Sequence, residues 1–280
     1  MPPIVLTIAG TDSGGAAGLA ADLRTFAALG VYGLCAITAV TAQDSEQVTA
    51  VQFMSPDFVA AQMAVVLADY GAAATSAGSV LAVKTGFIGR EETVEAVARQ
   101  LALYRPGWLV VDPVLVNQHA QPMFSPDLVE AYRAYLLPLA DLITPNWHEA
   151  ALLTHSSLPA AEKKVDWLAQ TARALYALGP RRVLITGVPL GTEIVDLFFD
   201  GQTDHLRRVS RLNTPNTHGS GDTLSAATAA FLAKGEGVEM AGIEPVEVAV
   251  QQAQQFTHQA IERGANWQLG SGHGPVWQLP

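Results

Sequence analysis

The chain of 280 residues is 49% hydrophobic and 15% charged, a balance that supports a sizeable buried core and excludes a largely disordered polypeptide. Its formal net charge of -10, without a long Lys/Arg run, excludes a broad surface for polyanions, so nucleic acid is not an expected partner. No uninterrupted apolar run reaches the roughly 18 residues of a membrane span, and no basic leader opens the sequence. We therefore expect one domain over residues 1–280, located in the cytoplasm and without a membrane partner.

Apolar runs rich in β-branched residues recur along the chain and are typical of strands buried on both faces of a sheet. They span Pro3–Ala9, Gly33–Val40, Val80–Val83, Trp108–Val111, Leu142–Thr144, Arg182–Thr186 and Ile194–Phe199. Helical periodicity separates most of them: a helix that ends near Gly30, then helices at Pro56–Asp69, Glu91–Tyr104, Pro126–Leu137, His148–Thr154, Ala161–Leu178, Asp222–Lys234 and Pro245–Arg263. This alternation predicts an α/β fold in which helices cover a mainly parallel sheet.

Cys35 is the only cysteine, which excludes a disulfide within the chain. Because Leu34 and Ala36 flank it in a predicted strand, we expect a buried thiol that packs as a small apolar side chain. A structural role is thus predicted for this residue rather than a reactive one.

The most informative segment is 216–225 (NTHGSGDTLS), where small residues lead into an apolar helix. A Gly-Ser-Gly turn at a helix N-terminus exposes backbone N–H groups, and the helix dipole favours a group that gathers negative charge there. This predicts an anion hole for a phosphoryl group in transfer. The amides predicted to form it are those of Gly219, Ser220, Gly221 and Asp222.

Asp222 is the candidate general base, because a carboxylate in the first turn of that helix can accept the proton of a hydroxyl group held in line with a phosphate. Aspartate is also a favoured helix N-cap, and local sequence alone favours that capping role. Support for catalysis must therefore come from elsewhere in the chain.

Residues 10–18 (GTDSGGAAG) directly follow the first predicted strand. Glycines at the carboxyl end of a strand let the backbone approach a ligand, and open α/β sheets bind ligands at this edge. The segment is neither a Walker phosphate loop nor a Gly-x-Gly-x-x-Gly fingerprint. On its own it indicates a loop on the ligand side and no particular ligand.

Two further strand ends carry oxygen ligands: Asp112 follows one predicted strand and residues 144–149 (TPNWHE) end the next. Mg²⁺ takes a few carboxylates, several waters and nucleotide phosphates, so Asp112 and Glu149 are the candidate metal ligands. Asn146 and Glu149 also have the spacing of a helix capping box, and the two roles are compatible.

Together these motifs resemble the bacterial hydroxymethylpyrimidine and phosphomethylpyrimidine kinases of thiamine synthesis, within the ribokinase-like superfamily, and their vitamin B6 relatives, the pyridoxal kinases. The resemblance runs from residues 6–12 (LTIAGTD) to the tail 272–276 (GHGPV). It also rests on 21–33 (ADLRTFAALGVYG), 36–43 (AITAVTAQ), 84–86 (KTG), 112–114 (DPV), 143–146 (ITPN) and 216–219 (NTHG). Each motif is weak alone, but their order and spacing are specific.

The resemblance implies a ribokinase-like three-layer α/β/α sandwich, a homodimer, and transfer of the γ-phosphoryl group of ATP to a hydroxymethyl group with the help of Mg²⁺. The ATP contacts that it implies are Asn146, Thr186 and His218, although a histidine beside such a turn is more often a loop hydrogen-bonding residue. The substrate pocket that it implies falls on Ala17, Asp22, Gln43, Phe87 and Val114. Gln43 would read the ring edge, and because a carboxamide is both donor and acceptor, it suits an aminopyrimidine and also tolerates a pyridine.

The chain departs from the thiamine-pathway pattern at several positions. Asp222 stands where those kinases usually carry Cys, whereas aspartate is usual in sugar and pyridoxal kinases. Residues 117–121 (NQHAQ) replace a Lys-Ser-Gly-Asp segment of a lid, and 185–189 (ITGVP) replace Val-Lys-Gly-Gly-His, so Thr186 stands for a lysine. Phe87 replaces the more usual Met and narrows the predicted pocket with a flat ring.

We therefore expect a kinase that phosphorylates 4-amino-5-hydroxymethyl-2-methylpyrimidine, and the sequence leaves open whether the monophosphate of that compound is also a substrate. The alternative is a pyridoxal or pyridoxine kinase of vitamin B6 salvage, a role that the departures favour. A third reading is a catalytically weak binding protein of the same fold, and retention of the Gly-Ser-Gly-Asp turn counts against it.

Overall fold

The structure, a computed structural model, describes residues 2–76, 80–117, 121, 123–235 and 244–279. Within them, an eight-stranded sheet has the strand order β10-β9-β8-β7-β6-β5-β1-β2. The bounds are β1 (Ile4–Ala9), β2 (Tyr32–Ile37), β5 (Leu81–Thr85), β6 (Trp108–Val111), β7 (Leu142–Ile143), β8 (Val183–Leu190), β9 (Glu193–Phe199) and β10 (Asp204–Ser210). Neighbours from β2 to β8 pair in parallel, whereas β9 pairs antiparallel with β8 and β10. The predicted mainly parallel sheet is confirmed.

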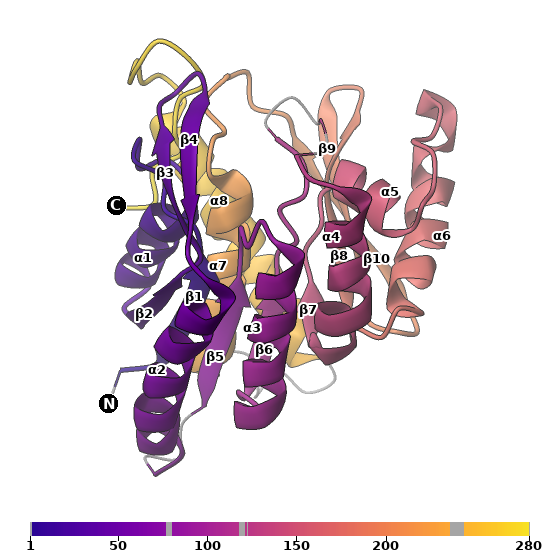
Figure 1. Cartoon of the computed structure of the whole chain (residues 1–280). Helices are drawn as coiled ribbons and strands as arrows, with labels where there is room; N and C mark the ends of the chain where they lie inside the picture. Colours follow the sequence, from indigo (N-terminus) through magenta and orange to yellow (C-terminus); the bar gives the residue numbers. More distant parts are fainter. Residues whose placement is uncertain (1, 77–79, 118–120, 122, 236–243, 280) are drawn as a thin grey trace.

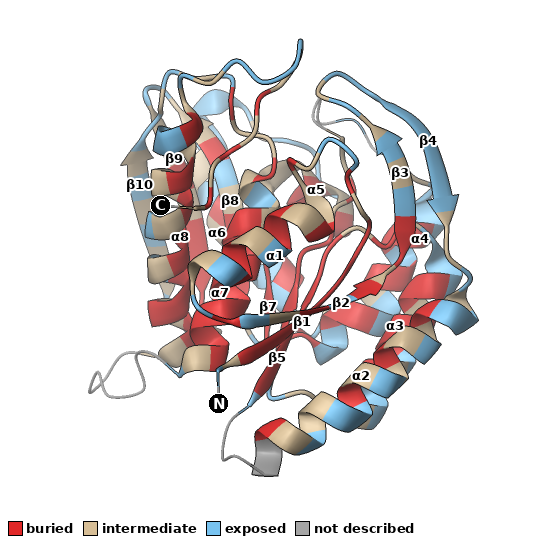
Figure 2. Ribbon diagram, turned by 90° about the vertical axis from the view of Figure 1, so that its left-hand side faces the viewer, coloured by how far each residue is buried: buried red, intermediate tan, exposed pale blue. Residues whose placement is uncertain are grey.

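Helices cover both faces of this sheet, which gives the three-layer α/β/α sandwich that the resemblance implies (Figure 1). One face carries α2 (Pro56–Ser76), α3 (Glu91–Tyr104), α4 (Pro126–Ala131), α5 (Trp147–Leu153) and α6 (Lys164–Tyr176). The other carries α1 (Gly18–Ala28), α7 (Ser220–Lys234) and α8 (Pro245–Gly264). Each layer packs its own buried cluster against the sheet, so the central strands are buried on both faces (Figure 2).

Side-chain alternation along the central strands sends polar residues toward α7. Leu6 and Ile8 of β1 belong to the core under α2 to α6, so Thr7 between them points to the opposite face. Lys84 follows Val83 in β5 and Asp112 follows Val111 of β6 in the same manner. All three polar residues are buried. The α7 side of the sheet therefore carries a polar cluster at its carboxyl edge.

A second, two-stranded sheet was missed by the strand prediction. It consists of β3 (Ala39–Gln43) and β4 (Val48–Phe53), which pair antiparallel. The predicted strand Gly33–Val40 divides at Thr38 into β2 and β3. The prediction failed for β4 because its side chains are exposed from Val48 to Gln52, so no buried face imposes a pattern on the sequence.

The prediction of a buried Cys35 is wrong, because this thiol is exposed. β2 lies at the edge of the main sheet, where Leu34 and Ala36 face the core beneath α2. Cys35 points to the opposite face, which is not covered at this position. Apolar neighbours in sequence therefore did not indicate the environment of the residue between them.

β1, β2 and β5 to β10 belong to one sheet, whereas β3 and β4 form the second, and one domain over residues 1–280 stays a prediction. Most predicted helices are present, although the helix at Pro126–Leu137 continues from α4 into a π-helical turn at Tyr132–Leu136. In the part of the chain that the structure describes, no helix is both long and apolar enough to cross a membrane.

Candidate active site

The turn that precedes α7 is pressed against the loop that follows β1. Gly219 is the N-cap of α7 with φ +80°, and a Cβ on it would lie 1.9 Å from the carbonyl oxygen of Ala16. A glycine is required here both by the left-handed backbone and by this close approach. The contact joins the two glycine-rich segments that the sequence singled out.

Of the four backbone amides expected to form an anion hole at this turn, at least one is already engaged. The N–H of Ser220 donates to the carbonyl oxygen of Thr217, so it is used within the turn. Those of Gly221 and Asp222 lie in the first turn of α7, where no side chain caps the helix. Their partial positive charge can therefore stabilise an anion placed before the helix.

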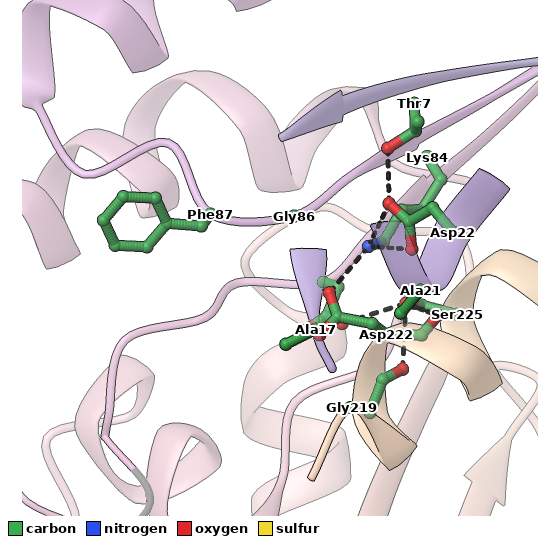
Figure 3. A network of polar contacts seen from close by, with 12 residues as sticks. Thr7, Ala17, Ala21, Asp22, Lys84, Gly86, Phe87, Gly219, Asp222 and Ser225 are labelled. Atoms are coloured by element: carbon green, nitrogen blue, oxygen red, sulfur yellow. Dashed lines mark hydrogen bonds and ion pairs between the residues drawn. The ribbon is translucent and has the colours of Figure 1, made fainter. Parts of the chain in front are cut away.

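Asp222 does not cap α7, because it occupies the third position of the helix and Gly219 is the cap. Its Oδ1 instead accepts a hydrogen bond from Nζ of Lys84 at 3.1 Å, and its side chain is 16% exposed (Figure 3). The capping role that local sequence favoured is thus not the one observed. A partly exposed carboxylate beside uncapped amides is instead suited to proton transfer at a phosphate.

Lys84 and Asp22 form a buried ion pair behind Asp222. Nζ of Lys84 lies 2.9 Å from each carboxylate oxygen of Asp22, and Thr7 donates to Oδ2 of Asp22 at 2.6 Å. Burial raises the pKa of Asp22, against the opposing effect of Lys84. Burial alone would lower the pKa of Lys84, but the surrounding carboxylates outweigh it and hold that pKa above its ordinary value.

Asp22 was expected at the substrate pocket, yet its side chain is fully buried. Both of its carboxylate oxygens are engaged by Lys84 and Thr7. The structure therefore places it behind the base, and it offers no exposed surface to a substrate. Lys84 and Thr7 were not predicted as site residues, although a lysine directly after the predicted buried strand Val80–Val83 was a usable signal, since buried lysines are almost always paired.

Asp112 and Glu149, the predicted metal ligands, lie close enough for the charge of one to disfavour ionisation of the other. Burial, with Asp222 as a further cause, raises the pKa of Asp112 to about 6. Burial, reinforced by Asp112, raises that of Glu149 to about 8. Such an excess of negative charge is what a bound cation would relieve. Ser225 donates to Oδ2 of Asp112 at 2.9 Å, which fixes the first carboxylate.

The capping box predicted at α5 is confirmed. Oδ1 of Asn146 accepts from the N–H of Glu149, and Oε2 of Glu149 accepts from the N–H of Asn146 at 2.9 Å. Oε1 of Glu149 accepts from the N–H of Leu115 at 3.0 Å, and the N–H of Val116 also bonds this carboxylate. Within the described ranges, no three His, Cys, Asp or Glu side chains gather into a self-sufficient metal site. The pair fits Mg²⁺, which leaves most positions to water and phosphate.

Of the residues expected at ATP, Asn146 and Thr186 are adjacent, because they form a parallel bridge between the segment that follows β7 and the middle of β8. His218 lies elsewhere: its Nε2 is 3.2 Å from Nε2 of Gln43 and 3.7 Å from Oδ2 of Asp12. The structure therefore groups His218 with Gln43, an expected substrate contact. Asp12 was missed by sequence reasoning, and its carboxylate accepts from the N–H groups of Ala16 and Ala17.

Phe87 belongs to an aromatic cluster that also contains Phe53 of β4 and Phe124. The ring centroids of Phe87 and Phe124 are 5.5 Å apart, and those of Phe87 and Phe53 are 6.2 Å apart. The ring of Phe87 also packs against Gly10, where a Cβ would lie 2.8 Å from its Cδ1. Val114, another expected substrate residue, donates its N–H to Asp112. Of the departure at 117–121, residues 118–120 lie outside the described residues.

The glycine-rich tail links the hairpin to the turn before α7. The N–H of His273 donates to the carbonyl oxygen of Ser45, in the turn between β3 and β4. The backbone of His218 exchanges hydrogen bonds with Gly274 and Val276. The tail thus packs against two loops that carry expected substrate and nucleotide contacts.

Gly219→Ala should destabilise the protein more than Gly30→Ala, the matched control. Both glycines have a left-handed backbone, but a Cβ at Gly30 would meet no atom within 4 Å. The control should therefore cost only the backbone term of about 1–2 kcal/mol. Urea unfolding of both variants measures the difference, and equal losses would show that the contact with Ala16 is not tight.

The free energy of unfolding of the ligand-free protein should fall as pH rises from 4.5 to about 8, in part because of Glu149. The folded state holds the Glu149 proton more tightly than the unfolded state. Between these two pKa values Glu149 is ionised in the unfolded state and still protonated in the folded state, so the free energy of unfolding falls as pH rises. Glu149→Gln should flatten this slope. Glu95→Gln, on the exposed surface of α3, should leave it unchanged, and a slope that Glu149→Gln does not alter would contradict the assignment.

Comparisons with known proteins agree with this geometry. Residues 12–277 match the phosphomethylpyrimidine kinase family. A hydroxymethylpyrimidine/phosphomethylpyrimidine kinase of Rhizobium meliloti is 44% identical, over 99% of this chain and 97% of its own. The structure of Staphylococcus aureus pyridoxal kinase in complex with AMP-PCP and pyridoxal superposes with a TM-score of 0.83 at 30% identity, covering 99% of this chain and 94% of that one.

A solved phosphomethylpyrimidine kinase from Clostridium difficile also superposes, with a TM-score of 0.75 at 32% identity over 92% of this chain and 99% of that one. The likeness therefore extends over almost the whole chain in both sequence and fold. The chain belongs to the phosphomethylpyrimidine kinase family.

Proposed function

We propose that the protein is an ATP-dependent kinase that phosphorylates the hydroxymethyl group of 4-amino-5-hydroxymethyl-2-methylpyrimidine. The observation that carries the proposal is the carboxylate of Asp222, held by Lys84 next to the uncapped amides of Gly221 and Asp222 at the start of α7. A base and an anion-stabilising helix terminus at one point are the two protein elements that phosphoryl transfer requires.

In the proposed reaction, Asp222 accepts the proton of the hydroxymethyl group while the hydroxyl oxygen of the substrate attacks the γ-phosphorus of ATP. The bond between this phosphorus and the bridging oxygen breaks, and ADP leaves with the electron pair. The amides of Gly221 and Asp222 stabilise the charge on the phosphoryl oxygens in transit. Asn146, after β7, and Thr186, in β8, are adjacent and are proposed to contact ATP, with Thr186 near its phosphates.

Asp112 and Glu149 are proposed to hold Mg²⁺, partly through water, on the grounds of their burial and mutual charge. When bound, the ion would neutralise phosphate charge as the bond to ADP breaks. Both carboxylates have hydrogen-bond partners that fix them before a ligand arrives, namely Ser225 for Asp112 and backbone amides for Glu149. The residues present therefore fit the cation.

Ala17, Gln43, Phe87 and Val114 are proposed to line the substrate pocket. Gln43 accommodates either an aminopyrimidine or a pyridine, so pyridoxal remains the second candidate substrate. The structural similarity to a pyridoxal kinase bound to pyridoxal favours testing it. His218 lies beside Gln43 and is proposed to orient its carboxamide, in addition to any contact with the nucleotide.

Purified protein should transfer phosphate from ATP to the hydroxymethylpyrimidine faster than to pyridoxal, in parallel assays that also include the pyrimidine monophosphate. Asp222→Asn should lower kcat about 10²–10⁴-fold, the usual contribution of a general base. Asp204→Asn, an ion-paired surface change in β10, is the control and should retain activity. A preference for pyridoxal would support the B6 alternative, and full activity of Asp222→Asn would exclude this residue as the base.

A homodimer is also proposed, as the family resemblance implies. The exposed valines of the β3–β4 hairpin, Val40, Val48 and Val51, are compatible with a partner surface. Light scattering should give a mass near twice the 29.5 kDa of one chain, and a monomer at all concentrations tested would exclude the dimer.

A further inference from the structure

The base of the proposed reaction is held by a second, deeper pair of charges. Lys84 and Asp22 have no exposed side-chain surface, whereas Asp222 in front of them is 16% exposed. They come from β5, α1 and α7, so three distant segments of the chain meet at one ammonium group (Figure 3). An arrangement of this kind requires the folded structure and is not a local feature of any one segment.

We propose that Lys84 and Asp22 are positioning residues for Asp222: Lys84 holds Oδ1 of Asp222, which leaves Oδ2 to receive the substrate proton, and Asp22 balances the charge of Lys84. The inference rests on the proposed function and adds the residues that prepare the base. Among the described residues, no hydrogen bond engages Oδ2 of Asp222, whereas Oδ1 lies 3.1 Å from Nζ of Lys84.

The surroundings of Lys84 are shaped for its ammonium group. Thr7, the register partner of Lys84 in β1, also donates to Oδ2 of Asp22, so two neighbouring strands hold this carboxylate. A Cβ on Gly86 would lie 2.9 Å from Nζ of Lys84, so the glycine leaves space for the ammonium group. Three N–H bonds of Lys84 thus have three acceptors available, two on Asp22 and one on Asp222.

Fold stability alone does not account for this cluster. A buried ion pair can often be replaced by apolar side chains without loss of stability. A lysine with a purely structural role would need only one carboxylate as a partner. Lys84 instead contacts two, those of Asp22 and Asp222, and a third, Asp112, acts on its charge from nearby. The second contact goes to the partly exposed carboxylate at the uncapped helix terminus, where the chemistry is proposed to occur.

The charges that act on Asp222 make two opposite predictions for pH dependence. The charged groups around it are Lys84 from β5, Asp22 from α1 and Asp112 at the end of β6. Lys84→Met removes the positive charge next to Asp222. Asp22→Asn removes a negative charge behind it, so the two variants change the local charge in opposite directions.

The decisive experiment is a double-mutant cycle on kcat, with Lys84→Met and Asp22→Asn made in the wild type and in Asp222→Asn. Lys84→Met should lower kcat of the wild type about 10²-fold, the scale of a misplaced catalytic group, with KM for Mg-ATP changed less than about twofold. In Asp222→Asn it should cause no further loss. Thr228→Val is the control, because Thr228 is buried in the same helix but bonds only the carbonyl oxygen of Leu224.

The acidic limb of the kcat profile should move to higher pH in Lys84→Met and to lower pH in Asp22→Asn. Asp22→Asn preserves size and shape, so it tests the proposal even where Lys84→Met does not fold, as judged by circular dichroism. Equal losses from these changes with and without Asp222, or shifts in one direction for both, would overturn the positioning role while the proposed function stands. Absence of transfer by the wild type to every acceptor would overturn the proposed function, and the positioning role with it.

Discussion

Parallel pairing of the central strands is the constraint on which the site depends. Because β1, β5 and β6 run in one direction, their carboxyl ends lie at one edge of the sheet, and side chains at equivalent positions point the same way. Thr7, Lys84 and Asp112 therefore face α7 from three neighbouring strands. Their contacts with Asp22, Asp222 and Ser225 join the sheet to the helices above it. The polar cluster is thus a consequence of strand register and not of a single motif.

The balance of charge in this cluster is uneven. Lys84 is surrounded by Asp22, Asp112 and Asp222, and Glu149 adds a further buried carboxyl near Asp112. One ammonium group does not neutralise this set. Burial is the main cause of the raised pKa of Asp112 and Glu149, and neighbouring carboxylates add to it. Burial would lower the pKa of Lys84, but the carboxylates around it hold that pKa above its ordinary value. An acidic protein can therefore favour a cation beside Asp112 and Glu149 and still offer the partial positive charge of backbone amides to phosphate at the N-terminus of α7.

Sequence reasoning found the parts of the site that local chemistry marks. The capping box of Asn146 and Glu149 follows a fixed spacing, and the Gly-Ser-Gly turn of residues 219–221 marks the start of α7. It did not find Lys84 as a site residue, because the partners of a buried lysine come from segments far away in the chain. It placed Asp22 in the pocket on resemblance alone, since nothing local reveals that both oxygens of a carboxylate are engaged inside the protein.

The same distinction explains the errors in the fold. Buried strands show a pattern because one environment acts on all their residues, whereas β4 has exposed side chains from Val48 to Gln52 that follow no single rule. Cys35 is exposed in β2, the edge strand of the main sheet. Whether a strand lies at an edge depends on the strand order, which the residues next to Cys35 in the sequence do not indicate. Strand order becomes visible only when distant segments are paired.

The contacts of the tail have a consequence for folding of the protein during its synthesis on the ribosome. Synthesis runs from the N-terminus, so β1 to β8 can pair and collapse while residues 270–276 are still unmade. Ser45 and His218 acquire their hydrogen bonds to the tail only afterwards. The loops of the site would then be the last part to become ordered, which would postpone ligand binding until the nascent chain emerges.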